Sequence, residues 1–329
     1  MSKGKWKSRA AIVIGFALSG VFLWLALRQT DFNSLVNAFA NIHYAPVAAS
    51  AGVMALGVFL RAIRWRIIAG RPSSDHSYFS RATNLGLLAN LVLPGRVGEF
   101  LKIVTFAKLS GSTLPAPLAS ALIDRLVDMF TLVTSALLLY LLMPIGEEIE
   151  KWFIRLVVSG FLITVFLVVF ARSSGKWEAI LAKILQRWLE RWQLRPEIFL
   201  MELRGEFRRI FSGWISLELG LLSLIIYSID YSTVAVLFLA FDIPLTLEAP
   251  LVLWVFLAAS STLPSAPSSI GVYQAAAVLA LSFYAVPAAE GVALATVKQL
   301  TILGVALLMN VPSLFGLLKQ SWVTARSTQ

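Results

Sequence analysis

Six stretches of this sequence are apolar over the length that a helix needs to cross a bilayer. Such a helix requires roughly 20 apolar residues, and the stretches lie at about 10–27, 45–63, 116–143, 152–171, 216–241 and 291–318. Of the 329 residues, 58% are hydrophobic and 14% are charged, whereas a soluble domain has about 25% charged residues. The sequence therefore predicts an all-α polytopic membrane protein.

Two further apolar segments, at about 84–109 and 251–284, are each interrupted by a leucine-proline break. The first break reads Leu93-Pro94-Gly95-Arg96, and the second reads Leu263-Pro264-Ser265-Ala266-Pro267. Proline cannot continue the hydrogen bonding of a helix. A helix broken at bilayer depth persists only where protein or a polar cavity satisfies its backbone. We therefore expect two re-entrant helical hairpins, with the breaks at the working centre.

Positive charges gather on one side of this topology. Basic residues are concentrated at 61–81 and 172–209, whereas the opposite connections carry acidic residues such as the run at 147–150. The positive-inside rule is satisfied when both termini are cytoplasmic, and the short loops suit a bacterial inner membrane. Two fully spanning hairpins remain an alternative, although they place the basic segment 172–210 outside.

The same topology predicts an internal repeat. Residues 45–143 and 216–318 each read helix, hairpin, helix, the first beginning outside and the second inside. We predict one membrane domain of two inverted repeats, a recurring plan of transporters. An N-terminal helix and outer loop (1–44) precede them, and a connecting helix (152–171) separates them. An amphipathic segment (172–211) is expected to lie in the cytoplasmic interface.

Composition excludes several classes of site. The chain has no cysteine and only two histidines, His43 and His76, which lie far apart. Disulfides, thiolate metal sites, cysteine nucleophiles and haem sites are therefore not expected, and neither is a cofactor. The net charge of +10 is spread beside apolar segments rather than over a soluble basic face. It indicates anionic lipid headgroups rather than nucleic acid as partners.

The first hairpin predicts an anion site. Pro94 follows Asn84 by about ten residues, roughly 15 Å of helix and half of a ~30 Å bilayer core. The next half-helix begins near residues 95–98 with unsatisfied N–H groups beside Arg96. Glu99 and Lys102 lie one and nearly two turns further on. Alternatively, Arg96 and Glu99 neutralise each other and only stabilise the hairpin.

Charged residues also occur inside the long apolar stretches. Asp124 and Asp128 share one face of the third long helix, with Arg125 between them. Such carboxylates can carry a proton, bind a cationic headgroup or neutralise Arg96 and Lys102. Asp230 and Lys298 are further buried candidates, and an ion pair between them is the simplest alternative.

The second break is polar but uncharged. Ser268 and Ser269 precede an apolar half-helix that includes Gln274. Either serine can cap that half-helix or bind phosphate oxygens. No carboxylate lies there, so proton coupling would have to come from elsewhere.

Four of these motifs together resemble the flippase-like transmembrane domain of lysylphosphatidylglycerol synthases and their stand-alone relatives, over nearly the whole chain. They are Arg61-Ala62-Ile63-Arg64-Trp65, Leu93-Pro94-Gly95-Arg96-Val97-Gly98-Glu99 with Lys102, Asp124-Arg125-Leu126-Val127-Asp128, and the second proline-glycine break. The resemblance implies movement of polar or charged lipids between leaflets, with Arg96, Glu99, Asp124, Arg125 and Asp128 at the positions of the family's buried polar motif.

The sequence departs from the family pattern at two places. Ser268-Ser269 and Gln274 stand where the family often has paired glycines and a glutamate, which argues against a cation-binding or protonatable role there. The chain also ends at Gln329 without the soluble synthase domain of some relatives. Aminoacyl transfer is therefore not expected, and we predict that the protein is not an enzyme.

These observations predict a lipid flippase that works by alternating access on membrane phospholipids, anionic or aminoacylated. A small-solute or ion-coupled secondary transporter remains an alternative within transport. From other classes, an intramembrane glycosyl or acyl transferase and a non-catalytic membrane subunit of a lipid-modifying enzyme remain open. The sequence is compatible with a homo-oligomer and with a separate synthase as partner.

Overall fold

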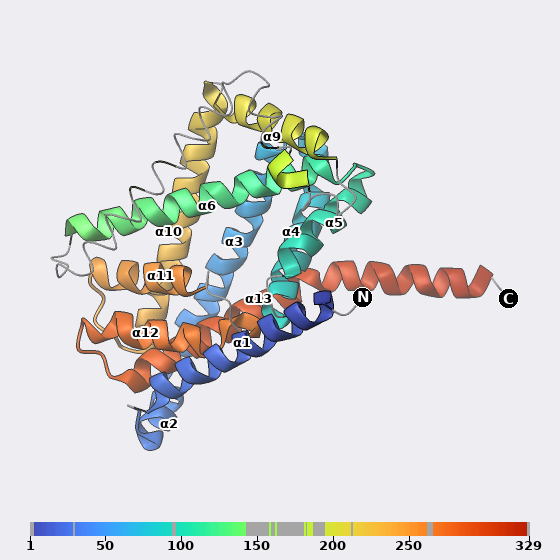
Figure 1. Cartoon of the computed structure of the whole chain (residues 1–329). Coiled ribbons are helices and arrows are strands. Elements are labelled where there is room, and N and C mark those ends of the chain that lie inside the picture. Colours follow the sequence, from blue (N-terminus) through green and yellow to red (C-terminus); the bar gives the residue numbers. More distant parts are fainter. Residues whose placement is uncertain are drawn as a thin grey trace. The chain divides into compact units, whose positions relative to one another are not determined.

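The computed structural model describes residues 3–142, 195–261 and 266–327, except for 29, 94–96 and 212, together with positions 158, 162, 181 and 183–186. Every regular element in these residues is a helix (Figure 1), which confirms the all-α prediction. The chain divides into two compact units. The first unit comprises residues 1–58, 80–102 and 229–329, and the second comprises residues 59–79 and 103–228. Most of the predicted connecting helix (152–171) and most of residues 172–194 lie outside the described residues.

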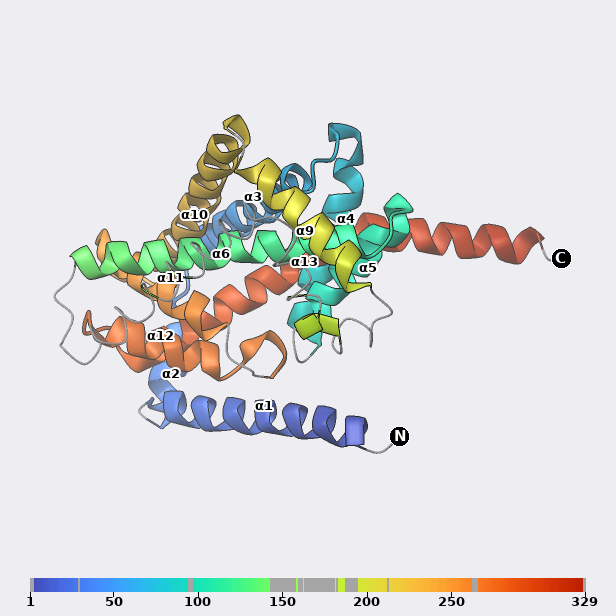
Figure 2. The same ribbon diagram turned by 45° about the horizontal axis from the view of Figure 1, so that its top comes forward.

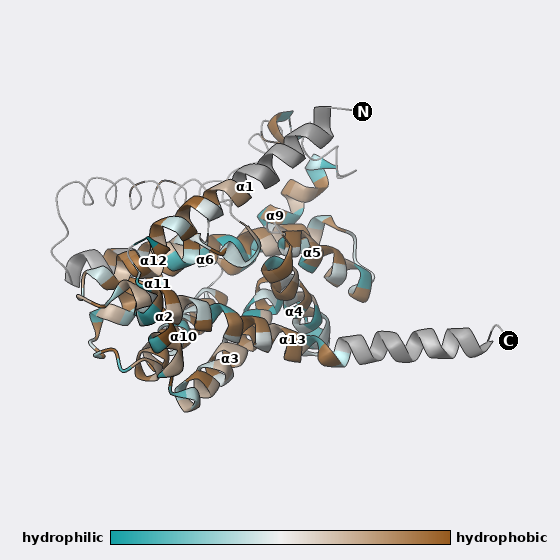
Figure 3. Ribbon diagram, turned by 90° about the horizontal axis from the view of Figure 1, so that it is seen from below, coloured by the Kyte–Doolittle hydropathy of each residue, from teal (hydrophilic) through white to brown (hydrophobic). Residues whose placement is uncertain are grey.

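Among the residues that the structure describes, three helices are long and apolar enough to cross a membrane. They are α3 (Tyr44–Ile68), α10 (Trp214–Ala240) and the part of α13 (Ala288–Ser327) that runs from Ala288 to Pro312. Hydrophobic residues occur along the length of α3 and α10 (Figure 3). By length and composition, three of the six predicted spans are thus confirmed.

Two shorter apolar helical stretches accompany these spans. One is Gly15–Leu27, the second half of α1 (Lys3–Leu27), and the other is α11 (Glu248–Ser260). A short helix, α2 (Phe32–Ala40), follows α1, and Asp31 is its N-cap residue, whose carboxylate accepts a hydrogen bond from the Ser34 N–H. α6 (Pro115–Leu142) is also long, but three charged residues lie in its first half.

The first proline break separates two helices where the sequence predicts it. α4 (His76–Val92) ends before it, and α5 (Val97–Ser110) begins after it. The two backbones approach closely at two glycines of the first unit, because a Cβ atom on Gly98 would lie 2.0 Å from the Gly86 carbonyl oxygen. Only glycine leaves room for this approach.

The same stretch of α4 is tied to α13 by amide side chains. Asn310 Nδ2 donates to the Asn84 carbonyl oxygen at 3.0 Å and to the Ala306 carbonyl oxygen at 2.7 Å. Both asparagines are buried, at 2% and 7% exposure. These bonds hold the first hairpin against α13 within the first unit.

The second proline break is longer. α11 ends at Ser260, a 3₁₀ turn, η4, covers Pro267–Ser269, and α12 (Val272–Ser282) follows. α11 and α12 pack against each other (Figure 2), and α12 also packs on α13 and on α1. α1 reaches the break itself, because Ser19 Oγ accepts a hydrogen bond from the Ala266 N–H at 2.8 Å.

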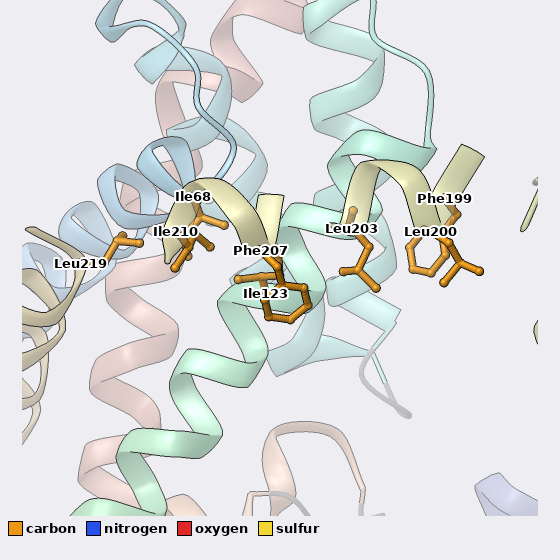
Figure 4. Close-up of a cluster of buried hydrophobic side chains, with 9 residues drawn as sticks. Ile68, Ile123, Phe199, Leu200, Leu203, Phe207, Ile210 and Leu219 are labelled. Atoms are coloured by element: carbon orange, nitrogen blue, oxygen red, sulfur yellow. The ribbon is translucent and has the colours of Figure 1, made fainter. Parts of the chain in front are cut away.

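In the second unit, α6 packs against α9 (Pro196–Ile210). The buried side chains of α9 meet those of α3, α6 and α10 in one apolar cluster (Figure 4). Its members are Ile68, Ala119, Ile123, Phe199, Leu200, Leu203, Phe207, Ile210 and Leu219. Fully burying such a side chain contributes about 1.5–3 kcal/mol. The amphipathic prediction for this segment therefore holds for α9, but its apolar face is covered by protein rather than left for the membrane interface.

Replacing Gly98 by alanine tests the close packing of the first hairpin. The added methyl group would meet both the Gly86 oxygen and the Asn90 side chain, so we expect a loss of about 1–3 kcal/mol, typical of overpacking. Thermal unfolding in detergent measures it. Gly52→Ala in α3 is the matched control, because nothing lies within 4 Å of its Cβ position. Equal melting temperatures for Gly98→Ala and wild type would contradict the packing described here.

Glu206 makes the stability of the second unit depend on pH. This carboxylate is 9% exposed and pairs with Arg209, and burial raises its pKa above the ordinary value despite that arginine. A raised folded-state pKa means that the folded state holds the proton more tightly, so stability increases as the pH falls from neutral towards about 4.5.

We therefore expect Glu206→Gln, which resembles the protonated form, to melt above wild type at neutral pH, with the difference shrinking towards pH ~5. Thermal unfolding as a function of pH measures this. Glu197→Gln, at an exposed position of the same helix, is the control. If acidification lowers the melting temperature of wild type more than that of Glu206→Gln, the predicted direction of the pKa shift of Glu206 is wrong.

Candidate functional site

The second unit buries an arginine between two aspartates. Arg64 lies on α3 with no exposed side-chain surface, and its Nε and Nη2 atoms are each 2.9 Å from Asp124 Oδ1. Its Nη2 atom is also 2.5 Å from Asp128 Oδ1. One guanidinium thus binds two carboxylates of α6. The four-residue spacing of these aspartates puts both on the helix face that meets α3.

Asp128 connects this pair to two more side chains. The Tyr227 hydroxyl of α10 donates to Asp128 Oδ1 at 3.0 Å, and Arg125 Nη1 donates to Oδ2 at 3.2 Å. The side chains of Asp128 and Arg125 are 26% and 41% exposed, whereas that of Asp124 is 3% exposed. The cluster is therefore closed at Arg64 and Asp124 and open at Asp128 and Arg125.

The residue after Arg64 fixes the position of α3 against α6. Trp65 is fully buried, and its Nε1 atom donates to Ser120 Oγ at 3.1 Å. Its ring packs edge-on against Phe79 at a centroid distance of 4.8 Å and lies 5.2 Å from that of Phe106. This packing keeps the Arg64 guanidinium next to Asp124.

Removing a single charged residue of this cluster is expected to destabilise the folded protein. A buried ion loses its hydration, and only close partners offset that loss. The field of Arg61, one turn before Arg64 on α3, also reaches Asp128.

The structure thus brings together the predicted residues Asp124, Arg125 and Asp128. The sequence analysis missed Arg64, which it placed among the cytoplasmic basic residues because the predicted span ended at residue 63. In the structure, α3 continues to Ile68. The signal available was the Arg61-x-x-Arg64 spacing, which places both arginines on one face of that longer helix.

At the first break, the structure places Glu99 and Lys102 but not Arg96, which lies outside the described residues. Asn90 Nδ2 donates to Glu99 Oε1 at 3.0 Å. Lys102 is buried at 5% exposure, with its Cβ beside Gly86. Both predicted residues therefore belong to the packed hairpin of the first unit.

At the second break, the side chain of Gln274 caps the start of α12, a position for which the sequence analysis considered Ser268 and Ser269. Gln274 Oε1 accepts a hydrogen bond from the N–H of Gly271, the N-cap residue of α12, at 2.7 Å, and Gly271 has φ 86°. Ser268 and Ser269 lie before it in the 3₁₀ turn, each with φ 57°. Gln274 therefore reaches back over one turn and satisfies the Gly271 N–H at the helix start.

Gln274 is further tied to α13. Its Nε2 atom donates to Gln299 Oε1 at 2.7 Å, and Gln299 Nε2 donates to the Ser268 carbonyl oxygen at 2.7 Å. Both ends of each amide are thus engaged in holding the break. This arrangement gives Gln274 a structural role in the first unit.

Lys298 has a different partner from the one considered in the sequence analysis. Its Nζ atom donates to the Tyr273 hydroxyl at 2.9 Å and lies 5.6 Å from the centre of that ring. Among the described residues, the alternative ion pair with Asp230 is therefore not formed. Asp230 lies half-buried in α10. The residues that the structure describes contain no group of three or more His, Asp and Glu side chains placed to hold a metal ion.

The fold and these buried charges define a helical integral membrane protein with an ionic cluster among its helices. The chain belongs to the family described as the lysylphosphatidylglycerol synthase TM region, whose model matches residues 12–309. This match confirms the resemblance found in the sequence and supports a function related to membrane lipids. Comparisons with curated proteins and with solved structures gave no match.

Removing Asp124 tests the ionic cluster. Asp124→Ala leaves the buried guanidinium with one partner fewer, and breaking a buried pair costs about 3–5 kcal/mol. The double variant Arg64→Met with Asp124→Leu removes both charges and is expected to recover part of that loss. Thermal unfolding of the three proteins measures the effect. A double variant less stable than Asp124→Ala would contradict this account.

Proposed function

We propose that this protein moves a phospholipid with a polar or charged headgroup between the two leaflets of a membrane. The observation that carries the proposal is the buried cluster of Arg64, Asp124 and Asp128, in a chain of a family linked to membrane lipids. Ionised side chains are costly inside a bilayer, and they mark the paths of polar substrates there. A headgroup needs such a polar path, whereas the acyl chains do not.

The proposed architecture follows the sequence analysis: about six spans and two re-entrant hairpins in two inverted repeats. Two helix pairs interrupted by proline breaks, α4 with α5 and α11 with α12, support it. Broken helices in inverted repeats allow the two halves to exchange conformations, which changes the side from which a central site is reached. The lipid tails would stay in the bilayer throughout.

In this proposal the protein is a transporter and not an enzyme. Its partners are anionic or aminoacylated membrane phospholipids, its membrane is the bacterial inner membrane, and both termini are cytoplasmic. Asp128 and Arg125, at the open end of the cluster, would receive the headgroup. The small-solute carrier of the sequence analysis is an outcome of the test below.

Reconstitution into liposomes tests the proposal. Labelled phospholipids are placed in both leaflets, and an impermeant reagent reports how fast the inner pool becomes accessible. We expect wild type to accelerate this exchange and Asp128→Asn to slow it about 10- to 100-fold. The reason is that losing a hydrogen bond to a charged group costs about 1.5–3 kcal/mol, and a free-energy barrier raised by this amount slows exchange by that factor.

Asp75→Asn is the matched control, since Asp75 ends the 3₁₀ turn Ser73–Asp75 and its side-chain contacts, with Arg71 at 3.9 Å and Ser74 Oγ at 3.5 Å, lie outside the cluster. It should exchange lipid at the wild-type rate. No exchange above empty liposomes for any lipid, with folded protein, would contradict the proposal and favour the small-solute carrier or a non-catalytic subunit.

A further inference from the structure

The short helix α2 presents apolar side chains that the described part of the chain leaves uncovered. None of its nine residues is buried, and Phe32 and Val36 are 75% and 48% exposed. Its large apolar residues recur at intervals of three and four positions, which places them on one face of a helix. They are Phe32, Leu35, Val36 and Phe39. α2 is therefore an amphipathic helix whose apolar face is partly open.

Three sides of α2 differ in their surroundings. α2 packs against α13 within the first unit, and the residues of one side are half-buried, namely Leu35, Ala38 and Phe39. The exposed polar residues gather on another side, namely Asn33, Ser34 and Asn37. At 100° of rotation per residue, Phe32 and Val36 lie between these two sides. The exposed apolar strip thus runs along the helix next to its polar side.

The helices before and after α2 carry side chains typical of a membrane surface. Near the end of α1, Trp24 is 60% exposed, and the guanidinium carbon of Arg28 lies 5.3 Å from the centre of its ring. α3, which is long and apolar enough to cross a membrane, begins at Tyr44, which is 74% exposed. Tryptophan, tyrosine and arginine at helix ends favour the boundary between lipid and water. Both neighbours of α2 therefore end at this boundary.

The connections keep α2 close to the same boundary. Phe32 follows Arg28 by four residues, and Tyr44 follows Ala40 by four residues. Four residues reach at most about 14 Å when fully extended. α2 continues from the end of α1 (Figure 1), and its packing on α13 holds it in place. Lipid is therefore the apolar phase within reach of the exposed strip.

We propose that α2 lies in the plane of the membrane interface, with Phe32 and Val36 inserted between the headgroups and the acyl chains of one leaflet. Its polar side faces water. Interfacial helices bury their apolar face about 5–10 Å into this boundary. α2 contains no charged residue, so apolar burial holds it there rather than attraction to anionic headgroups. The inference concerns a lipid surface of the first unit and is independent of the transport activity proposed above.

The experiment uses the absence of cysteine in this chain. Single cysteines are introduced into the full chain by Phe32→Cys and Val36→Cys, and each is labelled with a nitroxide after reconstitution into phosphatidylcholine liposomes. Asn33→Cys and Asn37→Cys are the matched controls, because they lie at exposed positions of the polar side. Power-saturation electron paramagnetic resonance measures the access of oxygen, which enters the acyl region, and of a nickel chelate, which stays in water.

We expect labels at residues 32 and 36 to be reached mainly by oxygen, at a depth of about 5–10 Å, and labels at residues 33 and 37 mainly by the nickel chelate. Adding phosphatidylglycerol to the liposomes should not change the depth. The proposal is overturned if the nickel chelate reaches all four labels equally, or if insertion requires the anionic lipid. Labels at 32 and 36 that neither reagent reaches would also overturn it, because protein, such as a second copy of the chain, would then cover the strip.

A second measurement needs no substitution and decides the question if the cysteine variants do not fold. Wild type is reconstituted with a phosphatidylcholine that carries a photoactivatable group near the start of one acyl chain, and the crosslinks are mapped by mass spectrometry. The proposal predicts crosslinks at Phe32 and Val36 and none at Asn33 and Asn37. Crosslinks elsewhere in the chain without any on α2 would overturn it.

Discussion

The second unit depends on one electrostatic constraint, which is the charge of Arg64 in an apolar interior. A guanidinium deprived of water needs carboxylates at hydrogen-bond distance, and α6 supplies two of them, four residues apart. The hydrogen bond from Trp65 to Ser120 fixes the position of α3 along α6, and the hydrogen bond from Tyr227 to Asp128 connects α10 to the cluster. The apolar cluster under α9 then covers the same ends of α3 and α6. Packing and charge thus specify one arrangement of these helices.

The first unit depends on a different constraint. Its helices are interrupted at the proline breaks, and the backbone N–H and C=O groups there need hydrogen-bond partners. At the second break, Gln274 and Gln299 satisfy the Gly271 N–H and the Ser268 carbonyl oxygen, and Ser19 of α1 accepts from the Ala266 N–H. At the first break, glycine contacts bring α4 and α5 close together. Protein groups therefore satisfy backbone atoms at the second break and pack closely at the first. A broken helix needs such partners to persist in a membrane.

The spans and breaks could be predicted from the sequence because they follow from local properties. Apolar run length identifies α3, α10 and α13, and proline marks where α4 and α11 must stop. Partner choice could not be predicted in this way. Arg64 was missed because its burial depends on α6, 60 residues further on. The cap by Gln274 was missed because its geometry is set by Gln299 on another helix. The pairing of Lys298 with Tyr273 likewise depends on how α12 packs on α13.

The central claim is that the cluster around Arg64 serves a substrate and not only the fold. A triple variant, Arg64→Met with Asp124→Leu and Asp128→Leu, separates the two roles, because apolar replacement of a buried ionic cluster is often neutral or stabilising. The measurement is lipid exchange in liposomes by triple-variant protein whose folding is verified by thermal unfolding. The account predicts a folded protein with no exchange above empty liposomes. A folded triple variant that exchanges lipid at the wild-type rate would contradict it.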